Sequence, residues 1–147
     1  MAIDETRFEY VGFWIRVAAS LIDTVLVSFL LVPIASLLLG RGLSFDAGAD
    51  LSFSALLLNC ILPAIAVVWF WLARQATPGK MVFGARIVDA ETGGRLSTGQ
   101  SIGRYLGYYV SLVGLGLGFL WVGLDARKQG WHDKLAGTVV VRERRGM

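Results

Sequence analysis

Three long apolar stretches, separated by polar and charged segments, dominate the pattern of residues along this chain. They cover about residues 17–39, 51–73 and 105–124; the first contains one ionisable residue, Asp23, and the other two contain no charged residue. A bilayer core about 30 Å thick needs roughly 20 helical residues, so each stretch is long enough for a transmembrane helix. The pattern therefore predicts an all-α integral membrane protein.

The third stretch differs from the first two because Gly114, Gly116 and Gly118 interrupt it. Glycine costs about 1 kcal/mol in a helix interior relative to alanine, so three alternating glycines form a weak point. The stretch can span the membrane as one helix, with Gly114 and Gly118 in close contact with a neighbouring helix. It can also break and return to the side from which it entered. The glycine spacing favours the broken form.

The segment between the second and third stretches, about residues 74–101, is polar and rich in turn-forming residues. Its MVFGARIVD sequence favours a strand and its DAETGGR sequence a turn, which predicts a short β-hairpin-like cytosolic loop. Ser97 or Thr98 can cap the helix that follows. Pro33 and Pro63, within the first two stretches, can each kink their helices.

Composition and charge agree with a membrane location. Hydrophobic residues make up 55% of the 147 and charged residues only 17%, against about a quarter charged in soluble domains.

Lys and Arg gather in the second loop and in the tail, residues 125–147. The positive-inside rule places the N-terminus and second loop in the cytoplasm, but a basic tail conflicts with three full spans. Because these charges flank the apolar stretches, membrane topology explains them without nucleic acid. Residues 1–147 are expected to form a single membrane domain.

Two charged residues lie on one face at the start of the first stretch. Arg16 and Asp23 are seven residues apart, so they are roughly 10 Å apart along one helix face, with Ser20 close to the same line. An ionised Asp at the centre of a membrane helix costs about 2.5 to 3.5 kcal/mol. Asp23 is therefore a hydrogen-bonded structural anchor, a proton or cation site, or a protonated residue without a role.

The tail contains the only histidine, next to an aspartate, in His132-Asp133. One His with no Cys or second His nearby does not predict a metal site. We interpret Asp133 as a helix N-cap or as a partner for nearby arginines. Lys80, in TPGK, lacks the context of a phosphate-binding glycine loop, and no nucleophile–base arrangement is apparent. We therefore expect no enzyme activity, no metal and no cofactor.

Several of these features together resemble the RDD family of bacterial membrane proteins, which is named for an arginine and two aspartates. Arg16 and Asp23, in GFWIRVAASLID, match the first two residues of the name, and Asp133, in GWHDKLAGTVVV, matches the third. TPGKMVFGARIVD, with the downstream Arg104, resembles the family's central loop. The resemblance covers about residues 12–141. It implies a small multi-pass protein of the bacterial inner membrane with at least two spans.

For function, the resemblance implies a small transporter or transporter component that exchanges monovalent cations and protons. In this hypothesis Asp23 carries the proton, Arg16 tunes its electrostatic field, and Asp133 couples to it from the cytoplasmic side. The alternative is a non-transporting assembly factor, scaffold or regulator of a partner complex, in which the same groups fix the fold. Two or three short spans enclose little pathway, so we expect a homo-oligomer or a partner membrane protein in the lipid bilayer. The supporting polar residues are Ser20, Lys80, Arg104 and His132.

Overall fold

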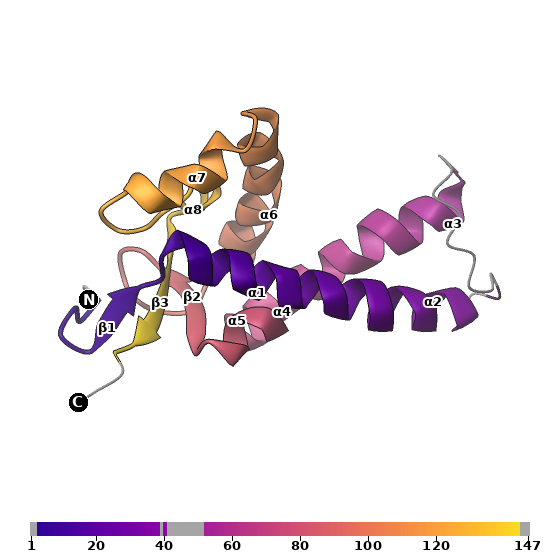
Figure 1. The fold of residues 1–147 in the computed structure, drawn as a ribbon, viewed down its shortest axis with the longest axis horizontal. Coiled ribbons are helices and arrows are strands. Elements are labelled where there is room, and N and C mark those ends of the chain that lie inside the picture. The colour runs from indigo at the N-terminus through magenta and orange to yellow at the C-terminus, as the bar shows by residue number, and fades with distance from the viewer. Residues whose placement is uncertain (1–2, 39, 41–51, 145–147) are drawn as a thin grey trace.

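The computed structural model describes residues 3–38, 40 and 52–144. Two long helical arms project from a compact end that holds a sheet and several shorter helices, and both chain termini lie at this compact end (Figure 1). The predicted ends of the first two apolar stretches, at residues 39 and 51, and the last three tail residues lie outside the described residues.

The two arms form an antiparallel hairpin of helices. The first arm consists of α1 (Phe13–Leu26), a π-helical turn η1 (Val27–Leu31) and α2 (Val32–Leu38). The second consists of α3 (Phe53–Leu56), a π-helical turn η2 (Leu57–Ile61) and α4 (Leu62–Arg74). Residues Phe13–Leu38 and Leu57–Arg74 are each long and apolar enough to cross a membrane. The structure therefore agrees, in length and composition, with the two predicted spans.

Each π-helical turn ends two residues before a proline, Pro33 in the first arm and Pro63 in the second. Proline has no N–H, and its ring crowds the carbonyl group four residues earlier, which disrupts a regular α-helix. A locally wider turn accommodates such a disruption. The helix therefore continues through both prolines, and the perturbation predicted there takes the form of a π-helical turn.

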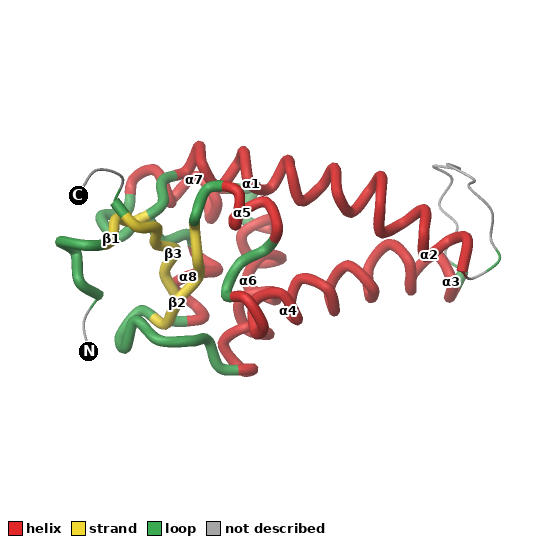
Figure 2. The backbone as a smooth tube through the Cα atoms, turned by 90° about the horizontal axis from the view of Figure 1, so that it is seen from below, coloured by secondary structure: helices red, strands yellow, loops and turns green. Residues whose placement is uncertain are grey.

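A three-stranded antiparallel sheet joins segments that lie far apart in the sequence. The strands are β1 (Phe8–Tyr10), β2 (Ala85–Asp89) and β3 (Thr138–Glu143), in the order β1-β3-β2. Figure 2 shows them together at the end of the molecule that carries both termini. The central strand β3 is buried over its four residues 138–141, which explains its continuous run of β-branched residues. The N-terminal flank, the central loop and the tail thus belong to one sheet.

The sheet corrects two predictions. The fold is mostly helical but not all-α, and the central loop does not form a hairpin, because β2 is the only strand it contributes among the described residues. After β2 the carboxylate of Asp89 accepts hydrogen bonds from the backbone N–H groups of Glu91 (2.9 Å) and Thr92 (2.8 Å), which forms a tight turn. The chain then enters a helix, so β2 pairs with the tail strand instead.

Four further helices complete the compact end: α5 (Pro78–Val82), α6 (Thr98–Val113), α7 (Leu117–Leu124) and α8 (Trp131–Ala136). Ser97 caps α6, as predicted, in a capping box with Gln100. Helices α6 and α7 are bent by 101° relative to each other at the break between Val113 and Leu117. Gly116 there has a φ of 77°, a conformation that glycine adopts without strain. The predicted break in the third apolar stretch is confirmed.

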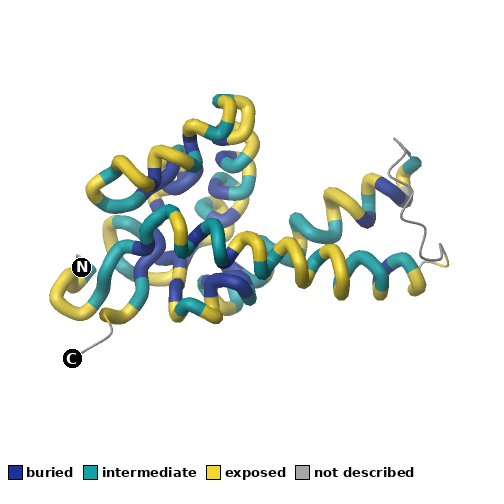
Figure 3. Tube along the Cα trace, viewed as in Figure 1, coloured by how far each residue is buried: buried dark blue, intermediate teal, exposed yellow. Residues whose placement is uncertain are grey.

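Burial separates the two parts of the molecule. Buried residues gather where the sheet meets α4, α6 and α8, whereas much of the arms is exposed (Figure 3). Trp71 of α4 packs with Ile87 of β2 and Val140 of β3 in the main core cluster. Large apolar side chains such as Phe29 and Leu38 are exposed along the first arm. An apolar surface this extensive is typical of a protein region covered by lipid or by another protein.

Candidate functional site

Asp133 of α8 is fully buried between two arginines from different helices. The Nη1 atom of Arg16, on α1, donates to its Oδ2 atom at 2.5 Å. Arg104, on α6, forms an ion pair with the other carboxylate oxygen. The backbone N–H of Gly130 also donates to Oδ2, at 2.9 Å. Asp133 is thus a partner for two arginines, as interpreted from its sequence context, whereas the N-cap of α8 is Gly130 and not Asp133.

The two arginines make further contacts that extend this ion-pair triad. Arg16 donates from Nη2 to the carbonyl of Lys128 (2.5 Å) and from Nε to the carbonyl of Val11 (3.1 Å). Arg104 donates from Nη1 to the hydroxyl of Thr138 at 2.7 Å. The triad therefore links α1, α6 and α8 to the beginning of β3. Because charged hydrogen bonds in a buried setting are strong, these links fix the geometry of the compact end.

Asp133 is ionised at neutral pH. Burial by itself raises the pKa of this carboxyl group, but the guanidinium groups of Arg104 and Arg16 outweigh burial and hold the pKa well below its usual range. The triad then contains two cations and one anion. One positive charge is left over among three buried side chains.

His132 is a buried ring that packs between two aromatic side chains. Its centroid lies 4.5 Å from that of Tyr108 and 5.3 Å from that of Phe119. Burial lowers the pKa of His132 to about 3, against the opposing effect of Asp133, so the imidazole is neutral at physiological pH. The described residues contain no group of three His, Cys, Asp or Glu side chains placed to hold a metal ion. His132 therefore has the environment of a packing residue.

Asp23 holds the short helix α5 against α1. Its carboxylate accepts from the Thr77 hydroxyl at 2.5 Å and from the Gly79 backbone N–H at 2.7 Å. The approach is so close that a Cβ atom on Gly79 would lie 2.0 Å from the carbonyl oxygen of Ala19. Only glycine fits there. From the sequence, TPGK was expected within the central loop, with no indication that a short helix begins after Thr77 or that a carboxylate from another helix accepts a hydrogen bond from its free N–H group.

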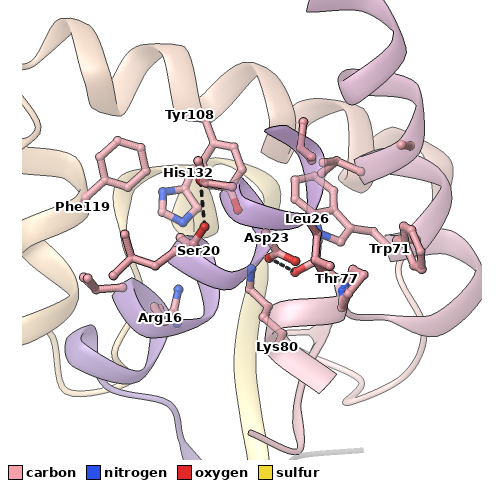
Figure 4. A pocket seen from close by; sticks show the side chains of 18 of the residues that line it. Arg16, Ser20, Asp23, Leu26, Trp71, Thr77, Lys80, Tyr108, Phe119 and His132 are labelled. Carbon is pink, nitrogen blue, oxygen red and sulfur yellow. Dashed lines mark hydrogen bonds between the residues drawn. The ribbon is translucent and has the colours of Figure 1, made fainter. Parts of the chain in front are cut away.

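Arg16 and Asp23 lie on one helix face, as predicted, but each binds a different neighbour. Both line a pocket of about 870 Å³ between α1, α4, α5, α6, α7 and α8. Figure 4 shows Asp23 bonded to Thr77, with Lys80 reaching into the same space. The remaining predicted residues that line this pocket are Ser20, Lys80, Arg104 and His132. The structure thus brings six of the seven predicted residues to one pocket, with Asp133 directly behind it.

Sequence reasoning missed several residues that shape this pocket. Trp71 and Tyr108 line it, and their rings contact each other edge to face at 5.7 Å. Gly107 lets α8 approach α6, because a Cβ atom there would lie 2.8 Å from Cα of His132. A small residue flanked by aromatic residues on a predicted membrane helix is a weak signal for such a contact.

Comparison with known proteins identifies the relatives of this chain. The model of the RDD family matches residues 10–137. The chain is 34% identical over 151 residues to the uncharacterized protein YxaI of Bacillus subtilis (strain 168), covering 88% of this chain and 95% of that protein. It is 30% identical over 141 residues to the uncharacterized membrane protein YteJ of the same organism, covering 92% of this chain and 82% of that protein. No solved structure matches. The family match and the Arg16–Asp23–Asp133 pattern lead to one conclusion: the chain belongs to the RDD family.

Proposed function

We propose that this RDD family membrane protein is a non-transporting membrane module, acting as a scaffold, assembly factor or regulator of a partner complex. The observation that carries the proposal concerns the three residues for which the family is named, Arg16, Asp23 and Asp133. Each of them contacts a different helix from its own. Arg16 and Asp133 join α1 to α8, and Asp23 joins α1 to α5. Groups engaged in this way support a fixed architecture.

In the proposed topology the arms cross the bacterial inner membrane twice and the compact end faces the cytoplasm. Strands β1, β2 and β3 come from the N-terminal flank, the central loop and the tail, and they pair in one sheet. Segments of one sheet lie on one side of a membrane, which requires an even number of crossings. The bent pair α6–α7 then enters and returns on the same side. This arrangement also accounts for a tail as basic as the central loop.

Exchange of monovalent cations and protons is the second candidate function. The observation in its favour is that Asp23 lines a large pocket together with Lys80. Against it, the Asp23 carboxylate already accepts two short hydrogen bonds. An ion that used this carboxylate would have to compete with both donors.

Proteoliposomes that contain the purified full chain separate the two functions. We expect no cation-dependent proton flux above that of empty liposomes, and we expect Asp23→Asn to lower thermal stability, because the amide weakens the contact with α5. Thr77→Val is the matched variant, since it removes a donor to Asp23 and leaves the carboxylate in place. Flux in the wild type that disappears in a stably folded Asp23→Asn variant would establish transport and contradict the scaffold proposal.

The scaffold proposal also requires a partner, and we propose self-association or a partner membrane protein in the bilayer. The exposed apolar side chains of the arms and of α7, such as Leu124, offer surface for such contacts. We propose neither nucleic acid binding nor enzyme activity, because the basic residues of the chain flank its apolar segments and its sequence offers no nucleophile–base arrangement.

A further inference from the structure

Three residues that line the pocket carry a side-chain hydrogen-bond donor with no partner among the described residues. Lys80 is 6% exposed and lines the pocket, and its side chain makes no hydrogen bond or ion pair with a described residue. The side chain of Lys80 reaches toward Asp23 in Figure 4. The indole Nε1 of Trp71 and the Nε of Arg104 are fully buried without a partner in the described part of the chain. Because buried donors are costly when unpaired, the pocket lacks acceptor atoms.

The charged groups around the pocket likewise include too few negative charges to balance the positive ones. Three cations, Arg16, Lys80 and Arg104, face two carboxylates, Asp23 and Asp133. His132 does not change this count, since its pKa of about 3 leaves it neutral. One positive charge is therefore uncompensated in a buried region, where charges interact much more strongly than in water. An anionic group in the pocket would balance it.

Beyond this polar part the pocket is apolar and extends along the arms. It is lined on the first arm by residues as far along as Leu31, on the second by Ala66 and Phe70, and on α6 by Leu112. The polar part lies toward the compact end and the apolar part toward the middle of the arms. In the proposed topology this is the orientation of a lipid in the cytoplasmic leaflet, with its headgroup outward and its chains inward.

We propose that the pocket binds one anionic phospholipid. Its phosphate accepts from the Lys80 ammonium group, and an acyl chain follows the apolar wall between α1 and α4. The volume of about 870 Å³ lies within the usual range of small-molecule sites. The inference stands apart from the choice between scaffold and transporter, since a bound lipid is compatible with either function.

The test uses the full chain purified in mild detergent, exchanged with vesicles of phosphatidylglycerol or phosphatidylcholine, and examined by native mass spectrometry. We expect one retained phosphatidylglycerol per chain and little phosphatidylcholine. Lys80→Met should reduce this retention about tenfold or more, the value of one charge-assisted hydrogen bond. Lys80→Arg should retain the lipid. The matched control is Lys134→Met, which removes an exposed lysine outside the pocket.

A second variant keeps the test decisive if Lys80→Met does not fold. Ala66→Phe leaves every charge in place and fills the apolar wall, so it should release the lipid and keep the folded helix content. Equal retention of the two lipids, or phosphatidylglycerol retention unchanged in a folded Lys80→Met or Ala66→Phe variant, would overturn the proposal. Recovery of a free fatty acid or detergent alone in the pocket would overturn the assignment to a phospholipid.

Discussion

Replacing Asp133 by asparagine is the sharpest perturbation of the ion-pair triad. Asparagine has nearly the same shape, so packing in α8 is kept, but the negative charge between Arg16 and Arg104 is lost. Both guanidinium groups then remain buried with no anion beside them. The asparagine side chain would also offer only one acceptor oxygen, although both carboxylate oxygens of Asp133 are engaged in the wild type.

The expected cost follows from the burial of the triad. Asp133 and Arg104 are each 0% exposed, so solvent does not screen the lost interaction. Removing one partner of a buried ion pair typically costs about 3 to 5 kcal/mol, because an uncompensated charge stays behind. For a chain of this size that corresponds to a fall in Tm on the order of 10 °C.

The assay is thermal unfolding of the full chain in one fixed detergent, with Glu91→Gln as the control. Glu91 is exposed, so its replacement should change stability by less than about 0.5 kcal/mol. The combined variant Arg16→Met/Asp133→Asn should be less destabilised than the sum of its single changes, because it removes one of the stranded cations. A Tm of Asp133→Asn within about 1 °C of the wild type would refute the reasoning.

Three further predictions address packing and pH. Gly107→Ala should destabilise the protein by about 1 to 3 kcal/mol, because the new Cβ would lie 2.8 Å from backbone of α8; Gly103→Ala, on the same helix with nothing within 4 Å, should be neutral or stabilising, and equal Tm losses would be inconsistent with this contact. Gly79→Ala should separate α5 from α1, seen as new protease cleavage near residue 79, and an unchanged cleavage pattern would argue against the contact. His132, with a folded pKa of about 3 below the unfolded value near 6.5, should make stability fall by up to about 1.4 kcal/mol per unit as pH drops below 6.5, since the unfolded chain binds the proton. His132→Phe should flatten this slope in melts at pH 5 to 7, and an identical slope in the variant would exclude His132 as its source.

The helical arms could be predicted from the sequence because their signals are local. An apolar run of sufficient length predicts a membrane helix by itself, and alternating glycines predict a weak point such as the break after Val113. The capping of α6 by Ser97 is equally local, since Ser97 and Gln100 are three residues apart. Such features depend on neighbours within a few residues along the chain.

The sheet and the site depended on contacts between distant segments. The strand Ala85–Asp89 was expected, but its partner strand lies in the tail. There the sequence offered a run of β-branched residues at 138–141, which does not identify the strand with which it pairs. Arg16 and Asp133 were predicted as site residues, yet their direct contact across 117 positions follows only from the fold. The acceptor role of Asp23 toward Gly79 likewise required the packing of α5 on α1, which no periodicity reveals.

The account rests on one sheet that unites the N-terminal flank with the tail, and cysteine cross-linking in intact membranes tests this most directly. Glu9 and Arg142 are register partners on β1 and β3 and form an ion pair at 2.5 Å, so Glu9→Cys/Arg142→Cys should form a disulfide in a Cys60→Ala background. Glu9→Cys/Arg95→Cys is the control pair and should not form one. We predict efficient cross-linking of the first pair before solubilisation. Absence of that cross-link, with the two thiols labelled from opposite sides of the membrane, would contradict the account.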